Sequence, residues 1–517
     1  MQQPYRPEPL TDYNGDQQVE ALGSALSAVA ACLGESYPLR IGGTDVWTDE
    51  RIVSRQPCDP DVIIGSVSKA DAALAERAIA AAHAAFPMWA SVAPEERAAV
   101  LFKAAALLRQ RKHIYNAWLM VEAGKTRSEA DADTAEAIDF LEYYGRQMLE
   151  LTRRGEEQLV HIDGELNELT YIPLGVGVVI SPWNFPLAIM AGMTTAALVT
   201  GNTVVLKPAS ATPVIAYHFV KLLEEAGLPA GAVQYVPGSG ADIGDLLVQH
   251  PLVRFVSFTG SKEVGVRMSR LVAQVAPGQH WLKRFIGELG GKDAIIVLPD
   301  ADLDAAAKAI VASAFGYSGQ KCSACSRAIL HKDCYDEVLE RCVQLANRLQ
   351  VGSALDAATQ VGPVINEAAY RKILKYFDIA KQEGRIAAGG GAAPGRGYLL
   401  QPTIVEGVNP EAVIMQEEVF GPLLAVCKAD DAEHALKIAN DTEFGLTGSI
   451  FTRDRKAIAK AKRDFHVGNL YINRKCTGAV VGAHPFGGFN MSGTDSKAGG
   501  PDYLLLFTQP KLIAELL

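Results

Sequence analysis

Two cysteines, Cys322 and Cys325, lie in the segment GYSGQKCSACSR (316–327), which is rich in small and polar residues. Such a composition is typical of a turn, where a thiol is accessible, rather than of a core strand. Cys322 could be a nucleophile, a metal ligand, half of a redox pair, or a small buried residue. A structural zinc needs a second ligand pair of similar spacing, and neither the other cysteines nor the ten histidines supply one. We therefore expect no metal.

An amide and a carboxylate could complete a site for attack on a carbonyl group. Asn184 lies in SPWNFP, where two prolines stiffen the loop, so its side chain could donate to an oxyanion or only tie down its own turn. Glu288, in GELGGKD, follows a predicted strand and precedes two glycines, so it could act as a base or simply be exposed. A thiol, an amide donor and a base together are what acyl transfer through cysteine requires.

A phosphate could bind where the predicted strand RFVSFTG ends. Gly260 and Ser261 precede the predicted helix SKEVGVRMSRLV, so main-chain N–H groups and a hydroxyl could face an anion, although the same pattern is often only a helix cap. GSGADIG is not a G-x-G-x-x-G sequence, and the usual dinucleotide fingerprint is missing. Lys207, at the end of TVVLK, could bond ribose hydroxyls or could be solvated.

The elements that must position these groups alternate between strand and helix. Residues 70–150 are helical by periodicity, and from residue 172 short β-branched runs are each followed by an amphipathic stretch, which predicts a parallel, doubly wound sheet. Ligands of such a sheet bind beyond the carboxyl ends of the strands, so the turns that follow the strands should lie along one edge. The predicted strands are GVGVVIS, TVVLK, AVQYVPG and RFVSFTG.

A second α/β series begins near residue 290 with DAIIVLP, a helix, and the strand SRAILH. The run AAGGGAAPGRG is too rich in glycine and alanine to be an ordered element, and we expect a surface turn there. The apolar segment LAIMAGMTTAALVTG is shorter than the ~20 residues that span a bilayer. We expect a buried helix instead.

Composition excludes several classes of function. The chain has 517 residues, 49% of them hydrophobic, and a formal net charge of -10, with no basic run that would attract nucleic acid. No membrane partner is expected, and the N-terminal residues resemble neither a signal peptide nor a transit peptide, which favours the cytoplasm. Eight sparse, irregularly spaced cysteines are unlike a disulfide framework, and we expect most of them to be reduced.

Taken together, these motifs resemble the aldehyde dehydrogenase superfamily over nearly the whole length of the chain. Within it, the chain is most similar to the members that oxidise L-glutamate γ-semialdehyde. The stretches that carry the resemblance, in the order of the family, are SPWNFP, TVVLKPA, FTGS, ELGGKD, GQKCSACSR, EEVFGP and PFGGFNMSG.

The resemblance implies catalytic and cofactor roles. Cys322 aligns with the nucleophile, Glu288 with the base that activates water, and Asn184 with the oxyanion donor. NAD is the expected cofactor. Where many members carry a glutamate that bonds the adenosine ribose, this chain has Ser210, which does not repel a 2′-phosphate, so some use of NADP is also expected. The cofactor positions fall on Ser181, Trp183, Lys207, Ser210, Gly260, Ser261, Glu418 and Phe420.

The expected substrate is L-glutamate γ-semialdehyde, formed from 1-pyrroline-5-carboxylate and oxidised to L-glutamate in proline catabolism. The alternatives are another semialdehyde dehydrogenase, such as one acting on succinic semialdehyde, a phosphorylating or CoA-acylating relative, and a non-catalytic binding protein of the same fold. Gly478 and Ala479 could form a carboxylate nest or an ordinary turn. The substrate positions implied by the resemblance are Glu136, Phe185, Lys321, Ser323, Gly478, Ala479 and Phe486.

The expected fold is α/β, with two doubly wound domains and a small β arm for oligomerisation. Residues 1–150 and 173–289 would form a Rossmann-like NAD-binding domain, and residues 290–475 the catalytic domain. The arm would comprise residues 151–172 and 495–517. It would hold a hairpin in EEQLVHIDGELNELTYIPLG with Asp163 and Gly164 at its turn, and GPDYLLLFTQPKLI as a closing strand. An exposed edge strand favours pairing, so we expect a homodimer, with higher oligomers open.

Overall fold

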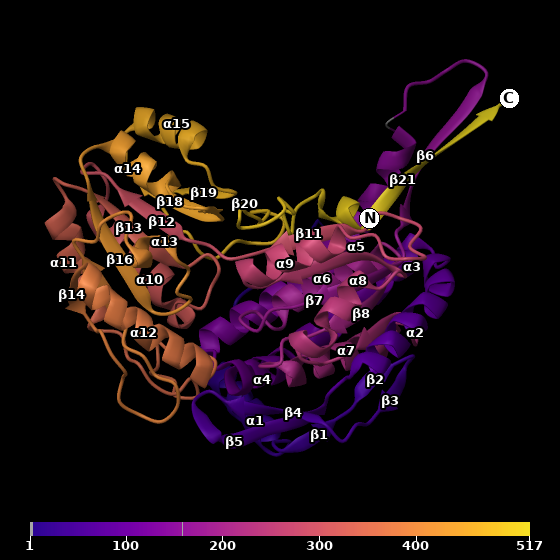
Figure 1. The fold of residues 1–517 in the computed structure, drawn as a ribbon, viewed down its shortest axis with the longest axis horizontal. Coiled ribbons are helices and arrows are strands. Elements are labelled where there is room, and N and C mark those ends of the chain that lie inside the picture. Colours follow the sequence, from indigo (N-terminus) through magenta and orange to yellow (C-terminus); the bar gives the residue numbers. More distant parts are fainter. Residues whose placement is uncertain (1–3, 158) are drawn as a thin grey trace.

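The computed structural model describes residues 4–157 and 159–517 as two α/β lobes with a projecting arm (Figure 1). The first lobe is built on a sheet with the strand order β11-β10-β7-β8-β9-β2-β3. Strands β7 to β11 are parallel, and β7 and β8 are buried along their whole length, as a sheet covered on both faces requires. The strands are β7 (Val176–Ile180), β8 (Thr203–Lys207), β9 (Val233–Tyr235), β10 (Val253–Thr259), β11 (Arg284–Glu288), and the antiparallel β2 (Leu39–Ile41) and β3 (Thr44–Val46).

The helices of this lobe begin and end where local signals predict. Helix α7 is followed by Gly227 in the left-handed conformation, and α9 is capped by the Ser261 hydroxyl, which accepts from the Val264 N–H group. Helix α6 is buried except at Ile189, which confirms the predicted buried helix. None of the helices in residues 4–157 and 159–517 has the length and apolarity needed to cross a membrane. The bounds are α2 (Ala72–Ala90), α3 (Pro94–Gln110), α4 (Lys112–Ala123), α5 (Arg127–Glu157), α6 (Ala188–Val199), α7 (Pro213–Ala226), α8 (Asp245–Gln249) and α9 (Lys262–Val272).

An additional small sheet, with the order β1-β5-β4, precedes these helices and was not predicted. Its strands are short or polar on one side, so the sequence signal is weak. With α1 it forms the lower edge of the first lobe in Figure 1. The elements are α1 (Asp16–Ala30), β1 (Glu35–Tyr37), β4 (Arg51–Gln56) and β5 (Asp59–Ser68).

The second lobe contains a sheet with the order β14-β15-β16-β13-β12-β18-β19, parallel except at β14. Residues 389–397 of the run AAGGGAAPGRG form no helix or strand, as expected, but its first two residues, Ala387 and Ala388, belong to a strand, β14. The strands are β12 (Asp293–Val297), β13 (Cys325–His331), β14 (Arg385–Ala388), β15 (Thr403–Glu406), β16 (Leu423–Ala429), β18 (Thr447–Phe451) and β19 (Asn469–Ile472). The helices are α10 (Leu303–Phe315), α11 (Tyr335–Ala346), α12 (Glu367–Glu383), α13 (Val413–Gln416), α14 (Ala432–Asn440) and α15 (Arg455–Asp464).

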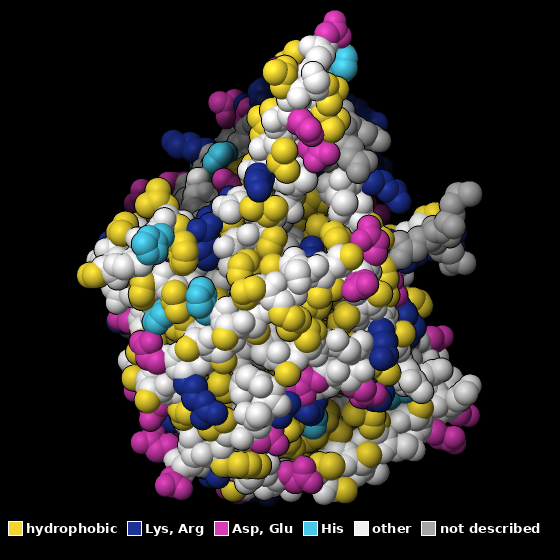
Figure 2. Space-filling view, turned by 90° about the vertical axis from the view of Figure 1, so that its right-hand side faces the viewer, with side chains coloured by type: hydrophobic (Ala, Val, Ile, Leu, Met, Phe, Trp, Pro, Cys, Tyr) yellow, Lys and Arg dark blue, Asp and Glu magenta, His cyan; other side chains and the backbone are white. Residues whose placement is uncertain are grey.

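The arm differs from the predicted hairpin. Strand β6 (Glu165–Pro173) pairs antiparallel with β21 (Thr508–Leu516), near the end of the chain. Residues 159–164 form no strand, although 163 and 164 do form the predicted turn. Residues 503–507 of the predicted closing strand form a 3-10 helix. The first strand of the predicted hairpin was therefore wrong. Alternation of apolar and polar residues predicts a strand, but it cannot say which other strand will pair with it. The arm projects at the top of Figure 2 and carries exposed apolar side chains.

Candidate active site

A cavity of about 420 Å³ lies between the lobes, at the carboxyl ends of the parallel strands of the first sheet. Three of the four strand-ending turns singled out from the sequence line it, those after β7, β8 and β10; the turn after β9 does not. Loop residues of the second lobe close the other side. Its lining includes the predicted site residues Ser181, Trp183, Asn184, Lys207, Gly260, Ser261, Cys322, Glu418 and Phe420.

The loop before Cys322 has an unusual main chain. Tyr317, Ser318 and Gly319 all have positive φ, at 52°, 54° and 69°, and two of them are not glycine. Such conformations are costly and persist only when the surroundings hold them. Here the Ser318 hydroxyl donates to the Gly362 carbonyl at 2.5 Å, and the buried Gln320 amide nitrogen donates to the carbonyls of Tyr317 and Pro363. The segment is a turn, as its composition predicted, but a tightly fastened one.

Cys322 is a partly buried free thiol on this cavity. Burial, with the nearby carboxylates of Asp293 and Glu418, raises the pKa of the Cys322 thiol well above its ordinary value. Glu288 also acts on it electrostatically. The resting thiol therefore keeps its proton. A group that can accept this proton is needed before the sulfur can attack.

Asn184 is buried, with 5% of its surface exposed, and lines the same cavity as Cys322. Its side-chain nitrogen donates to the main-chain carbonyl of Gln320 at 3.2 Å. An amide nitrogen carries two hydrogens, so one remains available after this bond is made. The structure thus brings together the amide and the thiol, which are 138 positions apart in sequence.

Glu288 is the last residue of β11 and is partly buried rather than exposed. Burial raises its pKa to about 8, although the Ser496 hydroxyl donates to one of its oxygens and Lys497 lies nearby. The other oxygen, Oε2, is buried and has no hydrogen-bond partner among the described residues. A carboxyl group with such a pKa can take up a proton near neutral pH.

The predicted cofactor residues form one wall. Lys207 is buried, not solvated, and burial lowers its pKa to about 8. Burial raises the pKa of Glu418 to about 7, and its Oε1 accepts from the Gly291 N–H group at 2.9 Å. Phe420, with φ at 58°, packs edge-on against Trp183, with ring centroids 5.4 Å apart. Ser210 is exposed beyond this wall, in the turn after β8.

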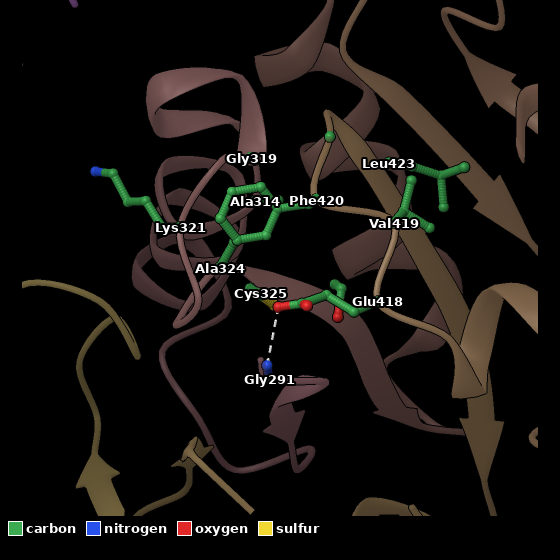
Figure 3. Close-up of a pocket in the computed structure, with 12 residues that line it drawn as sticks. Gly291, Ala314, Gly319, Lys321, Ala324, Cys325, Glu418, Val419, Phe420 and Leu423 are labelled. Atoms are coloured by element: carbon green, nitrogen blue, oxygen red, sulfur yellow. Dashed lines mark hydrogen bonds between the residues drawn. The ribbon is translucent and has the colours of Figure 1, made fainter. Parts of the chain in front are cut away.

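Two glycines of GELGGKD permit a close approach of these groups. A Cβ atom on Gly290 would overlap the Glu418 carboxylate, and one on Gly291 would overlap the Cys322 carbonyl oxygen. Figure 3 shows Glu418 bonded to Gly291, with Lys321 pointing away from both. All three residues line a second, smaller pocket.

The predicted substrate residues fall into two groups on the other side of the loop. Glu136 and Lys321 act on each other electrostatically; burial raises the pKa of Glu136 to about 8 and lowers that of Lys321. Phe185 packs under the Lys125 ammonium, 3.9 Å from its ring centroid. The second group connects through Cys476, whose thiol donates to the Ser323 carbonyl at 3.4 Å.

The loop after Cys476 carries the remaining substrate positions. Gly478 has φ at 76° and is exposed, and Ala479 follows it, partly buried. The main chain of Phe486 pairs with that of Ala498. The 420 Å³ cavity is lined by the predicted cofactor residues. It is not lined by Gly478, Ala479 or Phe486.

Several residues of the site had no signal in the sequence. Ser496 reaches Glu288 across 208 positions, and Lys125 and Asp133 form a buried ion pair beside Phe185. Contacts of this kind depend on how distant segments fold together. Helical periodicity could have placed Asp133 and Glu136 on one face of α5, but not their partners.

Comparison with known proteins places the chain in a family. The aldehyde dehydrogenase family model matches residues 47–513. The 1-pyrroline-5-carboxylate dehydrogenase of Geobacillus kaustophilus is 59% identical over 516 residues, covering 100% of both chains. A crystal structure of 1-pyrroline-5-carboxylate dehydrogenase from Thermus with bound NAD has a TM-score of 0.98 and 47% identity, covering 100% of this chain and 99% of that one. Proline utilization A from Bdellovibrio bacteriovorus has a TM-score of 0.97 and 41% identity, covering 99% of this chain and 53% of that one. The chain belongs to the aldehyde dehydrogenase family.

Proposed function

We propose that this protein oxidises L-glutamate γ-semialdehyde, formed from 1-pyrroline-5-carboxylate, to L-glutamate with NAD, in proline catabolism. The observation that carries the proposal is the meeting of the Cys322 thiol and the Asn184 amide on one cavity, with Glu288 close enough to influence the thiol. The full-length relatives named 1-pyrroline-5-carboxylate dehydrogenase support the choice of substrate.

The residues on the cavity fit a dinucleotide. A buried lysine, a partly buried carboxylate and the N-terminus of α9 offer partners for ribose hydroxyls and for phosphate. Lys207 would bond the adenosine ribose, Gly260 and Ser261 would face phosphate, and Glu418 would hold the nicotinamide ribose beside Phe420. Bound there, NAD supplies the hydride acceptor that aldehyde oxidation needs. Residues 1–150 and 173–289 would form the domain that holds it, and residues 290–475 the catalytic domain.

Cys322 attacks the aldehyde carbon as the thiolate, after its thiol has given its proton to a solvent water molecule. The Asn184 side-chain amide and the Cys322 main-chain N–H group then donate to the oxygen on which negative charge develops. This stabilisation acts in a partly buried site, where little water competes with the donors. Loss of hydride from the tetrahedral adduct leaves a thioester on Cys322.

Glu288 resolves the thioester by taking a proton from a water molecule that attacks the acyl carbon. Its carboxylate has a free oxygen among the described residues, and its raised pKa makes it an effective acceptor near neutral pH. A base at this position favours water over a phosphate or a thiol as the acyl acceptor. The product is then a free carboxylic acid.

Recognition of the substrate's amino-acid end is assigned to the loop opposite the cofactor wall. Main-chain N–H groups at Gly478 and Ala479, with the Ser323 hydroxyl, would bind the α-carboxylate. Phe185 and Phe486 would pack on the carbon chain, and Glu136 and Lys321 would supply charge nearby. A substrate that lacks the α-amino acid group, such as succinic semialdehyde, should have a lower kcat/KM.

The test is a trapped acyl-enzyme. The protein is mixed with NAD and L-glutamate γ-semialdehyde, quenched in acid within one turnover, digested and mapped by mass spectrometry. We expect a glutamyl adduct on the peptide that contains Cys322, no adduct in Cys322→Ala, and a normal adduct in the matched control Cys325→Ala, which removes the buried neighbouring thiol. An adduct on another cysteine would disprove the role of Cys322, and a better kcat/KM for succinic semialdehyde would disprove the substrate.

We also propose that the protein is a cytoplasmic homodimer joined through the arm. Leu166, Leu512 and Leu516 are 47%, 60% and 84% exposed, an apolar surface that a second copy could cover. The eight free cysteines are typical of a reducing compartment. Light scattering during gel filtration should give twice the mass of the chain, and a monomer would disprove the dimer.

A further inference from the structure

The junction between α4 and α5 contacts both loops that carry the proposed oxyanion donors. The Tyr317 hydroxyl donates to the Ala123 carbonyl at 2.6 Å, and the Tyr317 N–H group donates to the Glu129 carboxylate. Tyr317 belongs to the strained turn five residues before Cys322. The junction therefore fastens one of the two loops directly.

Lys125, in this junction, lies between the two loops. Its ammonium is 3.9 Å from the centroid of the Phe185 ring and 4.7 Å from that of the Tyr317 ring. Phe185 is the neighbour of Asn184, so one cation contacts an aromatic ring from each donor-bearing loop. Cation–π attraction of this kind strengthens when the cation is removed from water.

Asp133, on α5, holds the cation in place and fixes the first loop a second time. Its Oδ2 is 2.9 Å from the Lys125 ammonium, and the two side chains are 0% and 1% exposed. Its Oδ1 accepts from the N–H group of Ala188 at 2.7 Å, at the start of α6. Ala188 follows Asn184 by four residues, so this bond sets where the Asn184 loop ends.

We propose that Lys125 and Asp133 are positioning residues, which set the distance between the Asn184 amide and the Cys322 main-chain N–H group. The inference rests on the oxyanion role in the proposed function. Oxyanion donors must lie ~2.7 to 3.1 Å from the oxygen on which negative charge develops, and a displacement of ~1 Å can cost ~100-fold in rate. A fully buried ion pair adds little net stability compared with apolar residues, so its use lies in the geometry that it imposes.

A second buried ion pair, which joins α4 to α5, provides a matched control. Lys112 and Asp131 are 3.0 Å apart, with side chains 10% and 2% exposed. Asp131 accepts hydrogen bonds from Thr11 and Asn116, and neither loop of the active site contacts the pair in any of these bonds. Removing the Lys112–Asp131 pair therefore tests what the loss of a buried ion pair does when the proposed oxyanion donors are left unchanged.

The experiment combines the paired variant Lys125→Met/Asp133→Asn with Asn184→Ala. Asparagine at 133 can still accept from the Ala188 N–H group, and removing both charges together avoids leaving one unpaired. We expect kcat to fall ~10- to 100-fold, with a much smaller change in KM. On the Asn184→Ala background, where the donor is already lost, the same pair of changes should cost less than about threefold more. Lys112→Met/Asp131→Asn should keep the wild-type kcat.

Three results would overturn the inference, and they separate it from the proposed function. One such result is that the paired variant keeps the wild-type kcat. Another is that, on the Asn184→Ala background, the paired variant lowers kcat by the same factor as it does in the wild type. In either case the ion pair does not act through the oxyanion donors. If Asn184→Ala alone turns over normally, the oxyanion role is wrong and the inference fails with it. Should the paired variant not fold, Lys125→Arg carries the same test, because it keeps the charge but replaces the compact ammonium between the rings with a planar group.

Discussion

The side-chain amide of Asn184 donates to the main-chain carbonyl of Gln320, two residues before Cys322, at a distance of 3.2 Å. This bond joins a loop of the first lobe to the loop of the second lobe that carries Cys322. It also fixes the plane of the amide group, and with it the direction of the second hydrogen on the nitrogen. The proposed oxyanion donor is therefore held by the same loop that presents the proposed nucleophile.

Asn184→Ala should lower kcat ~100- to 1,000-fold, which corresponds to ~3 to 4 kcal/mol of lost transition-state stabilisation. The variant should still fold, because the side chain fills little of the core and its Gln320 partner keeps other contacts. Stopped-flow NADH absorbance measures the rate, and circular dichroism checks the fold. Asn184→Asp is a control that keeps the shape of the side chain. A carboxylate cannot donate a hydrogen bond, so this variant should be at least as slow as Asn184→Ala. Wild-type turnover in either variant would contradict the oxyanion role.

Glu288→Gln should separate acylation from hydrolysis. Glutamine cannot accept the proton of water, so we expect one equivalent of NADH per active site in a burst and then almost no turnover. In the wild type, the proposed base would work as the carboxylate, and the pKa of Glu288 is raised to about 8. The rate of hydrolysis should therefore rise with pH through about 8 and level off above it. Sustained turnover in Glu288→Gln would show that another group activates water.

Ser496→Ala tests the hydrogen bond to that base. The Ser496 hydroxyl donates to Glu288 and favours its charged form, which lowers its pKa. Without the hydroxyl, the pKa of Glu288 should rise further, and the rising limb of the pH profile should move to higher pH while the rate on the plateau changes less. Thr494→Ala, in the same segment, removes a hydroxyl that bonds the main chain of Gly287 instead and should leave the midpoint in place. An unmoved midpoint in Ser496→Ala would refute the coupling.

Ser210→Glu tests selection between the two dinucleotides. Ser210 is exposed near Lys207, where a carboxylate would repel a 2′-phosphate. A single repulsion at the surface amounts to ~1 kcal/mol, or roughly fivefold in kcat/KM. The wild type should show measurable activity with NADP, and the variant should lose most of it while activity with NAD stays. Ser210→Ala is the uncharged control. No activity with NADP in the wild type would contradict the prediction.

Much of the architecture could be predicted because its signals are local. β-branched runs predicted the central strands, and the glycine at 227 indicated where α7 ends. The small, polar surroundings of Cys322 predicted a turn with an accessible thiol, although not three successive residues with positive φ. The hairpin of the arm was mispredicted, since β6 pairs with β21, more than 300 positions away, rather than with the residues just before it.

The burial of the site residues, and their contacts with residues distant in sequence, could be learned only from the tertiary structure. A lysine at the end of a strand looks solvated in a linear sequence, yet Lys207 is buried in the folded chain, and burial lowers its pKa. Residue types along the chain were enough to propose a thiol, an amide and a carboxylate for the chemistry. The folded chain adds contacts such as those of Lys125 with Phe185 and Tyr317, which join three segments distant in sequence. The reason is physical: a local pattern encodes backbone conformation, whereas the dielectric surroundings and neighbours of a charge exist only after the segments have packed.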